Sequence, residues 1–479
     1  MDKTIHYLYK QCWSSQNRLL VLAIIFSLAF FSNDTYGLRI IFIGDVLLSR
    51  NVREELSSEK CSPWYNLKPL LNSADLVIGN LEGAVGKPDE QSSFKNEAPV
   101  FDIDSSHISL LTEAGFDIIT LENNHSNDLG KSGKKNTIKA IQKNQLSPVF
   151  FDNSPQFFTV KGVCIAVLTL NIVPGRELII TEIPSIELKQ KLRLARSLAD
   201  IVIVSVHWGS EFLDWPTTKQ RKIARWLIKN GTDLIIGSHP HVIQQPEMIE
   251  GKPVFFSLGN HLFDQKFPAT KKGLIVELYI HNGKMFYRGI ITKAQQNSFF
   301  PKISGIMNFK LKALRFKSSG IKTKDFTIRP KSVFYMDQFR LVLEAFQSGK
   351  KKWSSRPKSI ITAANSKLDD KHEYLFTLEK YYSKLDGEVN LRPYVYLIED
   401  RGLIPKWRGS ALAWPLLDAL ISLEDNTVLY ALHRGDSFIN LSQKVTSTRV
   451  AAYKWNGFGF SGISDSLICR SGRKAFFED

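Results

Sequence analysis

The sequence predicts an α/β domain over residues 38–300, followed by a smaller C-terminal domain of α+β type. From Leu38 to about Tyr279, short β-branched runs alternate with segments of helical spacing. The runs are almost continuously apolar, as is typical of strands covered on both faces. The 479 residues, 43% of them apolar, suffice for two to three domains with sizeable cores. This composition excludes collagen, coiled coils, wholesale disorder and disulfide-stapled miniproteins.

The N-terminus has the layout of an export signal. The apolar run LLVLAIIFSLAFF at 19–31 follows Lys3, Lys10 and Arg18. This run is shorter than the roughly 20 residues of a membrane span. We expect residues 1–37 to be a signal peptide or a retained signal anchor. The rest of the chain would then lie in the cell envelope, in the periplasm or on the outer face of the inner membrane; a buried core helix is the alternative.

The cysteines predict no disulfide framework. Loss of the signal would remove Cys12 and leave Cys61, Cys164 and Cys469, an odd number without metal-site spacing. Cys164 lies inside VCIAVLTL, and we interpret it as a core residue.

The strands of the α/β domain are predicted in order by seven runs. These are LRIIFIGD, ADLVIGN, FDIITLENN, VCIAVLTL, ADIVIVSVH, DLIIGSH and KPVFFSLGN. Between them, a helix capped by Ser105 or Ser106 is expected to end at Gly115. A second helix, in TTKQRKIARWLIKNG, places Ile223, Trp226 and Leu227 on one face and ends near Gly231.

The second half of the chain gives weaker signals. Residues Lys310 to Lys358 contain fourteen basic and three acidic side chains, which is most of the net charge of +16. We assign 301–369 as a basic linker or extension that is either solvated or attracts a polyanion such as an acidic polymer. No nucleic-acid partner is expected, because no recognition motif accompanies the charge. In 370–479, YLFTLEKYYSKL is predicted to be helical, and RPYVYLIED, NTVLYALH and RVAAYKW to be strands.

Polar side chains follow the ends of the predicted strands. They are Asp45, Asn80, Glu82, Asn124, His125, His207, His239, His241, Asn260 and His261. The carboxyl ends of strands in α/β domains gather ligand sites, so these residues are expected to converge. Taken singly, each is more often a turn or structural residue. Together, one Asp, one Glu, one Asn and three His suit zinc, manganese or iron. One or two such ions, with Glu82 between a pair, would hold a phosphate-like group and activate water.

At these residues the chain resembles the bacterial CapA family. The motifs are GDVLLSR, GNLEG, NNHSNDLG, VHWGSEF, GSHPHVIQ and SLGNHLFDQ, in that order within residues 38–300. That family is implicated in capsule synthesis, notably of poly-γ-glutamate, and is similar in fold to calcineurin-like metallophosphoesterases. The resemblance implies a four-layer sandwich of two mixed β-sheets flanked by helices, with the ligand loops on one edge.

The resemblance also implies roles for individual residues. The implied metal ligands are Asp45, Asn124, His207, His239 and His241, with His241 on the first metal and the other two histidines on the second. His125 matches the histidine that protonates the leaving group, a role suited to imidazole. Asp128 either orients His125 or is a solvated loop carboxylate, and the same alternatives hold for Glu211 beside His207.

The chain departs from the phosphoesterase pattern in two places. Leu47 stands where the first motif has a histidine ligand, and Asn80 replaces the bridging aspartate. A neutral amide bridges two cations poorly, so Glu82 must take that role, or the site holds one ion. His261 either replaces the missing ligand or, as we prefer, is a polar lining residue.

Two functions therefore remain open. In the first, the chain is a metal-dependent hydrolase in the biosynthesis of a capsule or envelope polymer. In the second, it is a non-catalytic assembly or export factor that uses the same crevice to hold an acidic polymer. The expected partners in either case are an acidic polymer or the capsule-synthesis machinery, with membrane anchoring through 19–31 if the signal is retained.

Overall fold

The computed structural model describes most of the chain after the N-terminal segment. The described residues are 37–58, 61–87, 99–175, 181–295, 297–307, 309, 314–315, 320–383, 388–409, 412, 416–434, 448–463 and 466–477. The export signal predicted at 1–37 therefore lies almost entirely outside them, and its apolar run at 19–31 does so completely. Within the described part, no helix is long and apolar enough to cross a bilayer.

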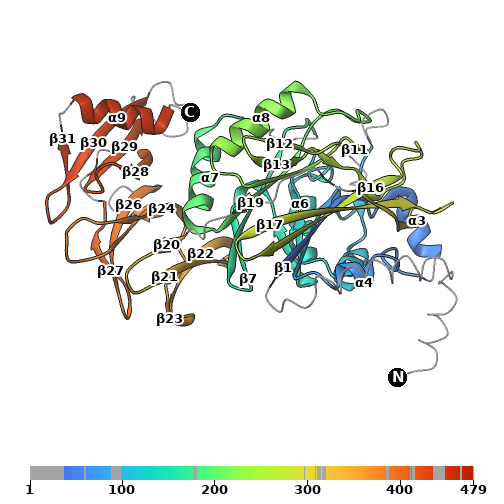
Figure 1. Ribbon diagram of the computed structural model, residues 1–479, viewed down its shortest axis with the longest axis horizontal. Coiled ribbons are helices and arrows are strands. Elements are labelled where there is room, and N and C mark those ends of the chain that lie inside the picture. The colour runs from blue at the N-terminus through green and yellow to red at the C-terminus, as the bar shows by residue number, and fades with distance from the viewer. Residues whose placement is uncertain are drawn as a thin grey trace.

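Two sheets form the centre of the α/β part (Figure 1). The first runs β18 (Pro301–Met307), β17 (Lys284–Ala294), β16 (Lys272–His281), β1 (Leu38–Val46), β2 (Leu76–Leu81), β5 (Ile118–Thr120) and β6 (Ser147–Val149). In addition, β15 (Asn260–Leu262) pairs with β1, and β19 (Leu314–Arg315) with β17. The second runs β12 (Glu247–Ile249), β13 (Lys252–Phe255), β10 (Leu234–Ser238), β9 (Ile201–His207), β8 (Val163–Asn171) and β7 (Gln156–Val160). Both sheets are mixed. In the first, β1, β2, β5 and β6 pair in parallel, and β16, β17 and β18 pair antiparallel on the other side of β1. In the second, the middle strands are parallel and both edge strands are antiparallel.

The two sheets share one apolar core. Ile40 and Phe42 of β1 belong to the same buried cluster as Ile165 of β8 and Ile203 of β9. The alternate residue Ile41 of β1 belongs to a second cluster, on the other face of the first sheet. Every side chain along such a strand is buried, which explains why the sequence runs are continuously apolar. The general α/β fold is thus confirmed.

Helices cover the outer faces of the sheets (Figure 1). The second cluster includes residues of α3 (Arg50–Ser58), α4 (Lys68–Leu71), α5 (Ser109–Ala114) and α6 (Gly130–Lys143). A third cluster joins the second sheet to α7 (Ile186–Leu198) and α8 (Thr218–Lys229). The shorter elements are β3 (Ala84–Val85), β4 (Asp102–Ile103), β11 (Ile243–Gln244), β14 (Ser257–Leu258) and the 3-10 turns η2 (Ser105–Ile108) and η3 (Phe151–Asn153).

The two predicted helices form, with one change at a cap. The side chain of Thr217 accepts the Gln220 N–H at the start of α8, and Gly231 has a φ of 107° just past its end. α5 ends at Gly115 as expected, with a φ of 100°. The predicted cap at Ser105 or Ser106 was wrong: the side chain of Asp104 caps the preceding turn η2 by accepting the Ser106 N–H.

In its described residues, the C-terminal part consists of three antiparallel sheets of four strands and one helix. The first of these sheets contains β20 (Ile321–Lys322), β21 (Thr327–Tyr335), β22 (Gln338–Gln347) and β23 (Lys350–Ser354). The second contains β24 (Ile360–Ser366), β25 (Tyr374–Ser383), β26 (Glu388–Glu399) and β27 (Gly402–Trp407). The third contains β28 (Leu416–Ile421), β29 (Val428–Arg434), β30 (Thr448–Trp455) and β31 (Phe460–Ile463), and the helix α9 (Ser466–Phe477) follows it. Much of the stretch 301–369, predicted as a basic linker or extension, forms strands.

The helix predicted from YLFTLEKYYSKL was wrong, because residues 374–383 of this segment form β25. Leu375 packs into the core beside α7, while Phe376 and Leu378 pack into a separate core of the C-terminal sheets. Residues 374–379 are buried on both faces of the strand, so the apolar residues there do not alternate with polar ones, and their spacing imitates that of a helix.

The prediction of no disulfide was also wrong, because Cys61 is disulfide-bonded. The spacing of cysteines along a chain does not reveal which of them meet in space. Cys164 is free and buried, as expected, and burial raises the pKa of its thiol to about 11.

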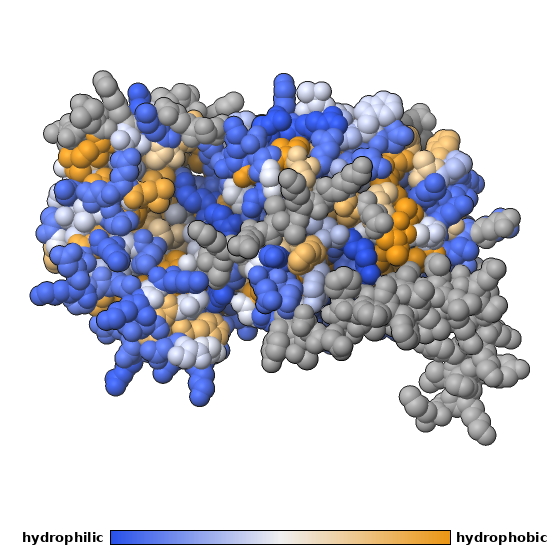
Figure 2. Space-filling view, in the orientation of Figure 1, coloured by the Kyte–Doolittle hydropathy of each residue, from blue (hydrophilic) through white to orange (hydrophobic). Residues whose placement is uncertain are grey.

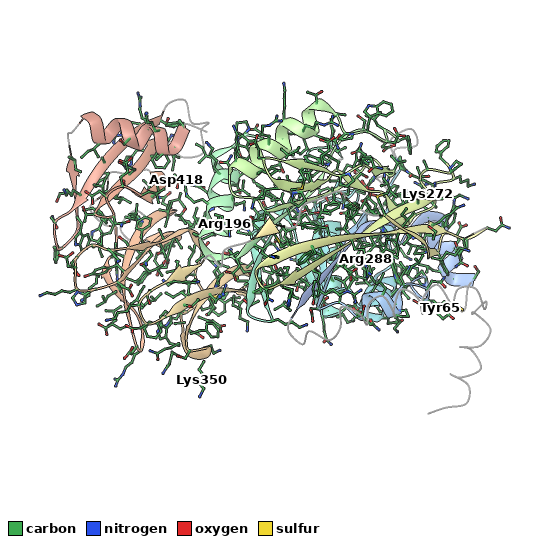
Figure 3. All side chains as sticks on the ribbon, viewed as in Figure 1. Tyr65, Arg196, Lys272, Arg288, Lys350 and Asp418 are labelled. Atoms are coloured by element: carbon green, nitrogen blue, oxygen red, sulfur yellow. The ribbon has the colours of Figure 1, made fainter. Side chains whose placement is uncertain are left out.

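An ion pair between Arg193 of α7 and Asp418 of β28 connects the C-terminal sheets to α7. Asp418 is labelled in Figure 3. Arg193 of α7 donates to both carboxylate oxygens of Asp418 at 2.7 Å. Replacing Arg193 by Met leaves this carboxylate, whose side chain is only 3% exposed, without its cation. We expect the free energy of unfolding to fall by about 2–3 kcal/mol in urea denaturation. In the control Arg225→Met, loss of the exposed pair with Glu250 should cost under about 1 kcal/mol. Equal losses would contradict the prediction.

Candidate metal centre

The structure brings all six predicted ligands together at the carboxyl ends of strands from both sheets. Asp45 lies near the end of β1, where a bulge follows Ile43 and shifts the register with β2. Gly44 occupies this bulge, since a Cβ there would lie 2.2 Å from the carbonyl oxygen of Gly259. The close approach of the two backbones turns the Asp45 carboxylate toward loops of the second sheet, where its Oδ2 accepts the backbone N–H of His239 at 3.1 Å.

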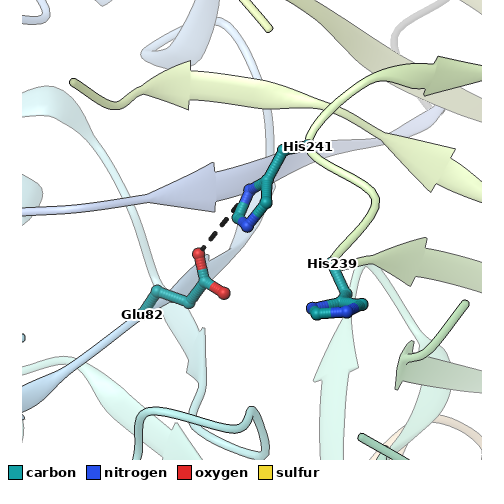
Figure 4. Close-up of side chains that lie close together, drawn as sticks. All are labelled: Glu82, His239 and His241. Carbon is teal, nitrogen blue, oxygen red and sulfur yellow. Dashed lines mark ion pairs between the residues drawn. The ribbon is translucent and has the colours of Figure 1, made fainter. Parts of the chain in front are cut away.

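The ligand atoms fall into two groups that share one carboxylate. Glu82, His239 and His241 offer atoms within 4.8 Å of one another, and so do Asp45, Glu82 and His207. Figure 4 shows the first group, with Glu82 beside His241. The expected division was His241 on one metal and the other two histidines on the second. One group contains His239 and His241, and the other contains His207 and Asp45. The ring centroids of His207 and His239 also lie 4.8 Å apart, so the division of the histidines between two ions stays a prediction.

Glu82 is the centre of this arrangement. Its side chain is fully buried, yet neither carboxylate oxygen has a hydrogen-bond partner in the described part of the chain. Its nearest neighbours are His207 Nε2, 3.3 Å from Oε1, and His241 Nδ1, 4.0 Å from Oε2. Burial raises the pKa of Glu82 to about 8, against the opposing effect of His241. A buried carboxylate without hydrogen bonds is costly, and a cation between its neighbours would offset that cost.

His207 is held from both sides of its ring. Its Nε2 lies 2.8 Å from Asn124 Oδ1, and its Nδ1 lies 2.9 Å from Ser238 Oγ. Burial lowers the pKa of His207 to about 3, so the imidazole is in the neutral form that binds metals. Glu211 is exposed and does not orient this ring, so of its two alternatives the solvated loop carboxylate applies. Ser238 orients the His207 ring instead.

His239 and His241 lie on a strained backbone. Their φ angles are 93° and 59°, in the left-handed region that non-glycine residues seldom adopt. The Nδ1 atom of His239 is buried without a hydrogen-bond partner among the described residues. Burial lowers its pKa to about 2, which leaves it neutral. His241 Nδ1 lies 2.9 Å from Asn260 Oδ1 and 3.5 Å from Asp45 Oδ2.

His125 is held at the edge of the cluster by its own loop. Its Nδ1 lies 2.8 Å from Asp128 Oδ2, an oxygen that also accepts the backbone N–H of Phe101 at 2.7 Å. The ring of Phe101 stacks on the imidazole with centroids 3.7 Å apart. Because a carboxylate only accepts, Nδ1 carries a proton and Nε2 is directed away from Asp128. Asp128 was expected either to orient His125 or to be a solvated loop carboxylate, and this geometry supports the first alternative.

Asn80 and Asn123 connect Asp45 to the loop of His125. Asn80 Nδ2 donates to Asp45 Oδ1 at 2.7 Å, and Asn123 Nδ2 donates to Asn80 Oδ1 at 3.2 Å. Asn123 Oδ1 then accepts the backbone N–H of His125 at 3.1 Å. Asn80 thus occupies the position of the bridging aspartate of phosphoesterases, and it holds the candidate ligand Asp45 in place.

The second departure, Leu47, and the candidate replacement ligand His261 add no ligand atom to either group. Leu47 is fully buried in the apolar core under the helices and offers no ligand atom. His261 is buried, and its Nδ1 accepts the N–H of Gly44 at 3.1 Å. It belongs to neither group of ligands, so it does not replace the missing histidine.

Sequence reasoning missed three positioning residues: Ser238, Asn260 and Asn123. Asn260 was visible as a strand-end residue, and Asn123 as the first residue of the Asn-Asn-His motif. No local signal marks Ser238, because its role depends on the register between β9 and β10, in which it lies opposite His207.

The donor set fits a divalent transition metal. Three neutral or neutralisable imidazoles, two carboxylates and one amide oxygen are the mixed ligands that zinc, manganese and iron accept. The Glu82 oxygens and the His239 Nδ1, which have no partner among the described residues, are buried electron-pair donors that a cation in the cluster would satisfy.

Comparison with known proteins agrees with these motifs. The family model "Bacterial capsule synthesis protein PGA_cap" matches residues 39–265, which contain every predicted ligand. "PGA biosynthesis protein CapA" of Bacillus subtilis is 30% identical over 258 residues, covering 50% of this chain and 67% of that protein. "Capsule biosynthesis protein CapA" of Bacillus anthracis is 29% identical over 284 residues, covering 55% and 69%. The uncharacterized protein y4sH of Sinorhizobium fredii is 20% identical over 374 residues, covering 60% and 79%. The chain belongs to the bacterial CapA family of capsule synthesis proteins.

Proposed function

We propose that this chain acts in the biosynthesis of a capsule or envelope polymer of poly-γ-glutamate type as a metal-dependent hydrolase. The observation that carries the proposal is Glu82, a buried carboxylate without hydrogen bonds that both ligand groups share. The shared core of the two sheets and their helix-covered outer faces support the four-layer sandwich that such a hydrolase would have.

Glu82, Asp45, Asn124 and the three histidines would hold one or two ions of manganese, zinc or iron. When bound, such ions supply Lewis-acid polarisation of a phosphate-like or acyl group and a reactive water at neutral pH. The protein adds a fixed frame, because Asn80, Ser238 and Asn260 hold the ligands Asp45, His207 and His241 in place.

His125 would supply the proton for the leaving group. As an acid the imidazole carries a proton on each nitrogen, with Asp128 Oδ2 accepting from Nδ1–H and the Phe101 ring holding the plane of the imidazole fixed. In that form Nε2–H donates to the leaving oxygen or nitrogen, and the proton moves to it as the bond to the central atom breaks. Asp128 acts through His125 and is a positioning residue.

The second candidate is a non-catalytic factor that holds an acidic polymer in the same crevice. Leu47 and Asn80 favour it, because they remove one ligand and the usual bridging carboxylate. Its polymer would also meet the C-terminal sheets, where exposed basic residues are Lys322, Lys324, Lys331, Lys350, Lys351, Lys352 and Arg356. Figure 2 shows hydrophilic side chains projecting from these sheets, and Figure 3 shows Lys350 at their edge. Export to the cell envelope, as the segment at 19–31 suggests, is part of both proposals.

The two candidates differ in metal-dependent turnover. The full-length chain is stripped with a chelator and reloaded with Mn²⁺ or Zn²⁺. Hydrolysis of bis(p-nitrophenyl) phosphate is then measured, together with shortening of poly-γ-glutamate. A hydrolase regains activity on at least one substrate after reloading, and the double variant Asp45→Asn/His241→Ala does not. If the reloaded chain contains metal but cleaves neither substrate, and binds poly-γ-glutamate equally with and without metal, the non-catalytic function is correct.

A further inference from the structure

Three large aromatic side chains are exposed on two loops of the α/β part. Phe212 is 47% exposed and Trp215 63% exposed, both in the loop after β9, and Phe267 is 64% exposed in the loop between β15 and β16. Phe212 and Phe267 touch edge to face, with ring centroids 5.5 Å apart. Leaving such rings in water costs hydrophobic free energy, so a group of them on two separate loops indicates a binding surface.

The Phe212 loop is fastened to the loop of the metal ligands. The backbone N–H of Phe212 donates to the carbonyl of Pro240, which lies between His239 and His241, at 2.9 Å. At the other end, Gln244 Nε2 donates to the carbonyl oxygens of Leu213 and Trp215 at 2.8 and 3.0 Å. These hydrogen bonds hold the backbone of Phe212 in a fixed position relative to the candidate ligands.

The Phe267 loop is fastened to the same ligands from the other side. Asn260, whose Oδ1 bonds to His241, donates through Nδ2 to Gln265 Oε1 at 2.9 Å and to the carbonyl of Thr270 at 3.1 Å. Gln265 and Thr270 lie on either side of Phe267. One amide thus orients a ligand and holds the loop of the second aromatic ring.

Phe212 also lies on a strained backbone. Its φ is 64°, in the left-handed region that a phenylalanine seldom adopts. The structure therefore keeps an exposed ring on an unfavourable backbone, next to two candidate ligands that are themselves strained at φ 93° and 59°.

We propose that Phe212 and Phe267 are specificity-determining residues that contact a ring-bearing group of the substrate beside the metal centre. The inference rests on the proposed function. It assigns the substrate an anionic or carbonyl centre at the metal and, next to it, a ring whose flat face packs on these side chains. Poly-γ-glutamate itself has no ring, so this substrate would be another molecule of the same biosynthesis. A lipid surface is the other ligand that exposed aromatics suit. The Phe212 loop exposes the carboxylates of Glu211 and Asp214, which an anionic bilayer repels, whereas Lys266 beside Phe267 is exposed and would be attracted to it. The hydrogen bonds that connect both loops to the segment of His239 and His241 favour the substrate.

Two phosphonates test this directly, because they bind without being cleaved. Methylphosphonate and phenylphosphonate share the anionic group and differ in the ring. Their affinities for the full-length Mn²⁺-loaded chain are measured by isothermal titration calorimetry. We expect phenylphosphonate to bind roughly 5-fold more tightly. The variant Phe267→Ala, which leaves the strained residue in place, should lose this preference, and so should Phe212→Ala/Phe267→Ala.

The matched control is Phe458→Ala, which removes a ring that is 89% exposed in the hairpin of β30 and β31 and should leave the preference unchanged. Equal affinities of the two phosphonates in the unmodified chain overturn the inference and leave the metal centre standing. If neither phosphonate binds the metal-loaded chain, both the inference and the proposed function fail. If instead Phe267→Ala abolishes sedimentation with anionic phospholipid vesicles while the phosphonate preference persists, the rings bind lipid and the inference is wrong.

Discussion

The Glu82→Gln chain is expected to lose its metal, because a single carboxylate serves both groups of ligands. The change keeps the shape of the side chain and removes its charge, and a neutral amide holds a divalent cation poorly. Even loss of a group that only supports a ligand typically lowers metal affinity by 10–100-fold, so loss of this ligand should lower it by roughly 100-fold or more. The measurement is metal content by elemental mass spectrometry after gel filtration of the loaded chain.

Glu122→Gln is the matched control for this experiment. Glu122 is also buried, with 6% exposure, but its carboxylate accepts the backbone N–H of Phe151 and faces Lys134. Glu122 belongs to neither ligand group, so the Glu122→Gln chain should contain as much metal as the unmodified chain. If Glu82→Gln retains full metal content, Glu82 is not a shared ligand and the other candidate ligands hold the ion.

The His125→Ala chain is expected to retain its metal and lose turnover by roughly 100-fold on phosphodiesters with an alkyl leaving group. An alkoxide is a poor leaving group and needs the proton that His125 supplies. A p-nitrophenolate leaves readily without one, so the same variant should lose much less activity on bis(p-nitrophenyl) phosphate. This dependence on the leaving group distinguishes an acid from a residue that only supports the fold. Asp128→Asn should show the same trend more weakly, since it acts through His125.

His372→Ala is the control for His125→Ala. His372 also has a carboxylate three residues away, at Asp369, but both side chains are exposed and lie in the C-terminal sheets. It should change neither turnover nor metal content. Loss of metal in His125→Ala, or an equal loss of activity on both kinds of substrate, would falsify the role of general acid.

The strands and the ligand types could be predicted because both depend on short stretches of consecutive residues. Runs such as LRIIFIGD and ADIVIVSVH are buried on both faces, so their composition alone marks them as strands. Each donor directly follows such a run, and carboxyl ends of neighbouring parallel strands lie at one edge of a sheet. The same reasoning failed for β25, where burial on both faces produced a spacing that resembled a helix.

The sequence by itself thus determined the α/β class, the candidate ligands and the family, since these depend on short motifs and their order. Only the tertiary structure decided that Glu82 lies within reach of both groups of candidate ligands, that Ser238 and not Glu211 holds His207, and that Phe212 meets Phe267. These contacts depend on strand register and on loops that are distant in the chain. A shift of one residue in the pairing of β9 with β10 would separate Ser238 from His207, and no local pattern records that register.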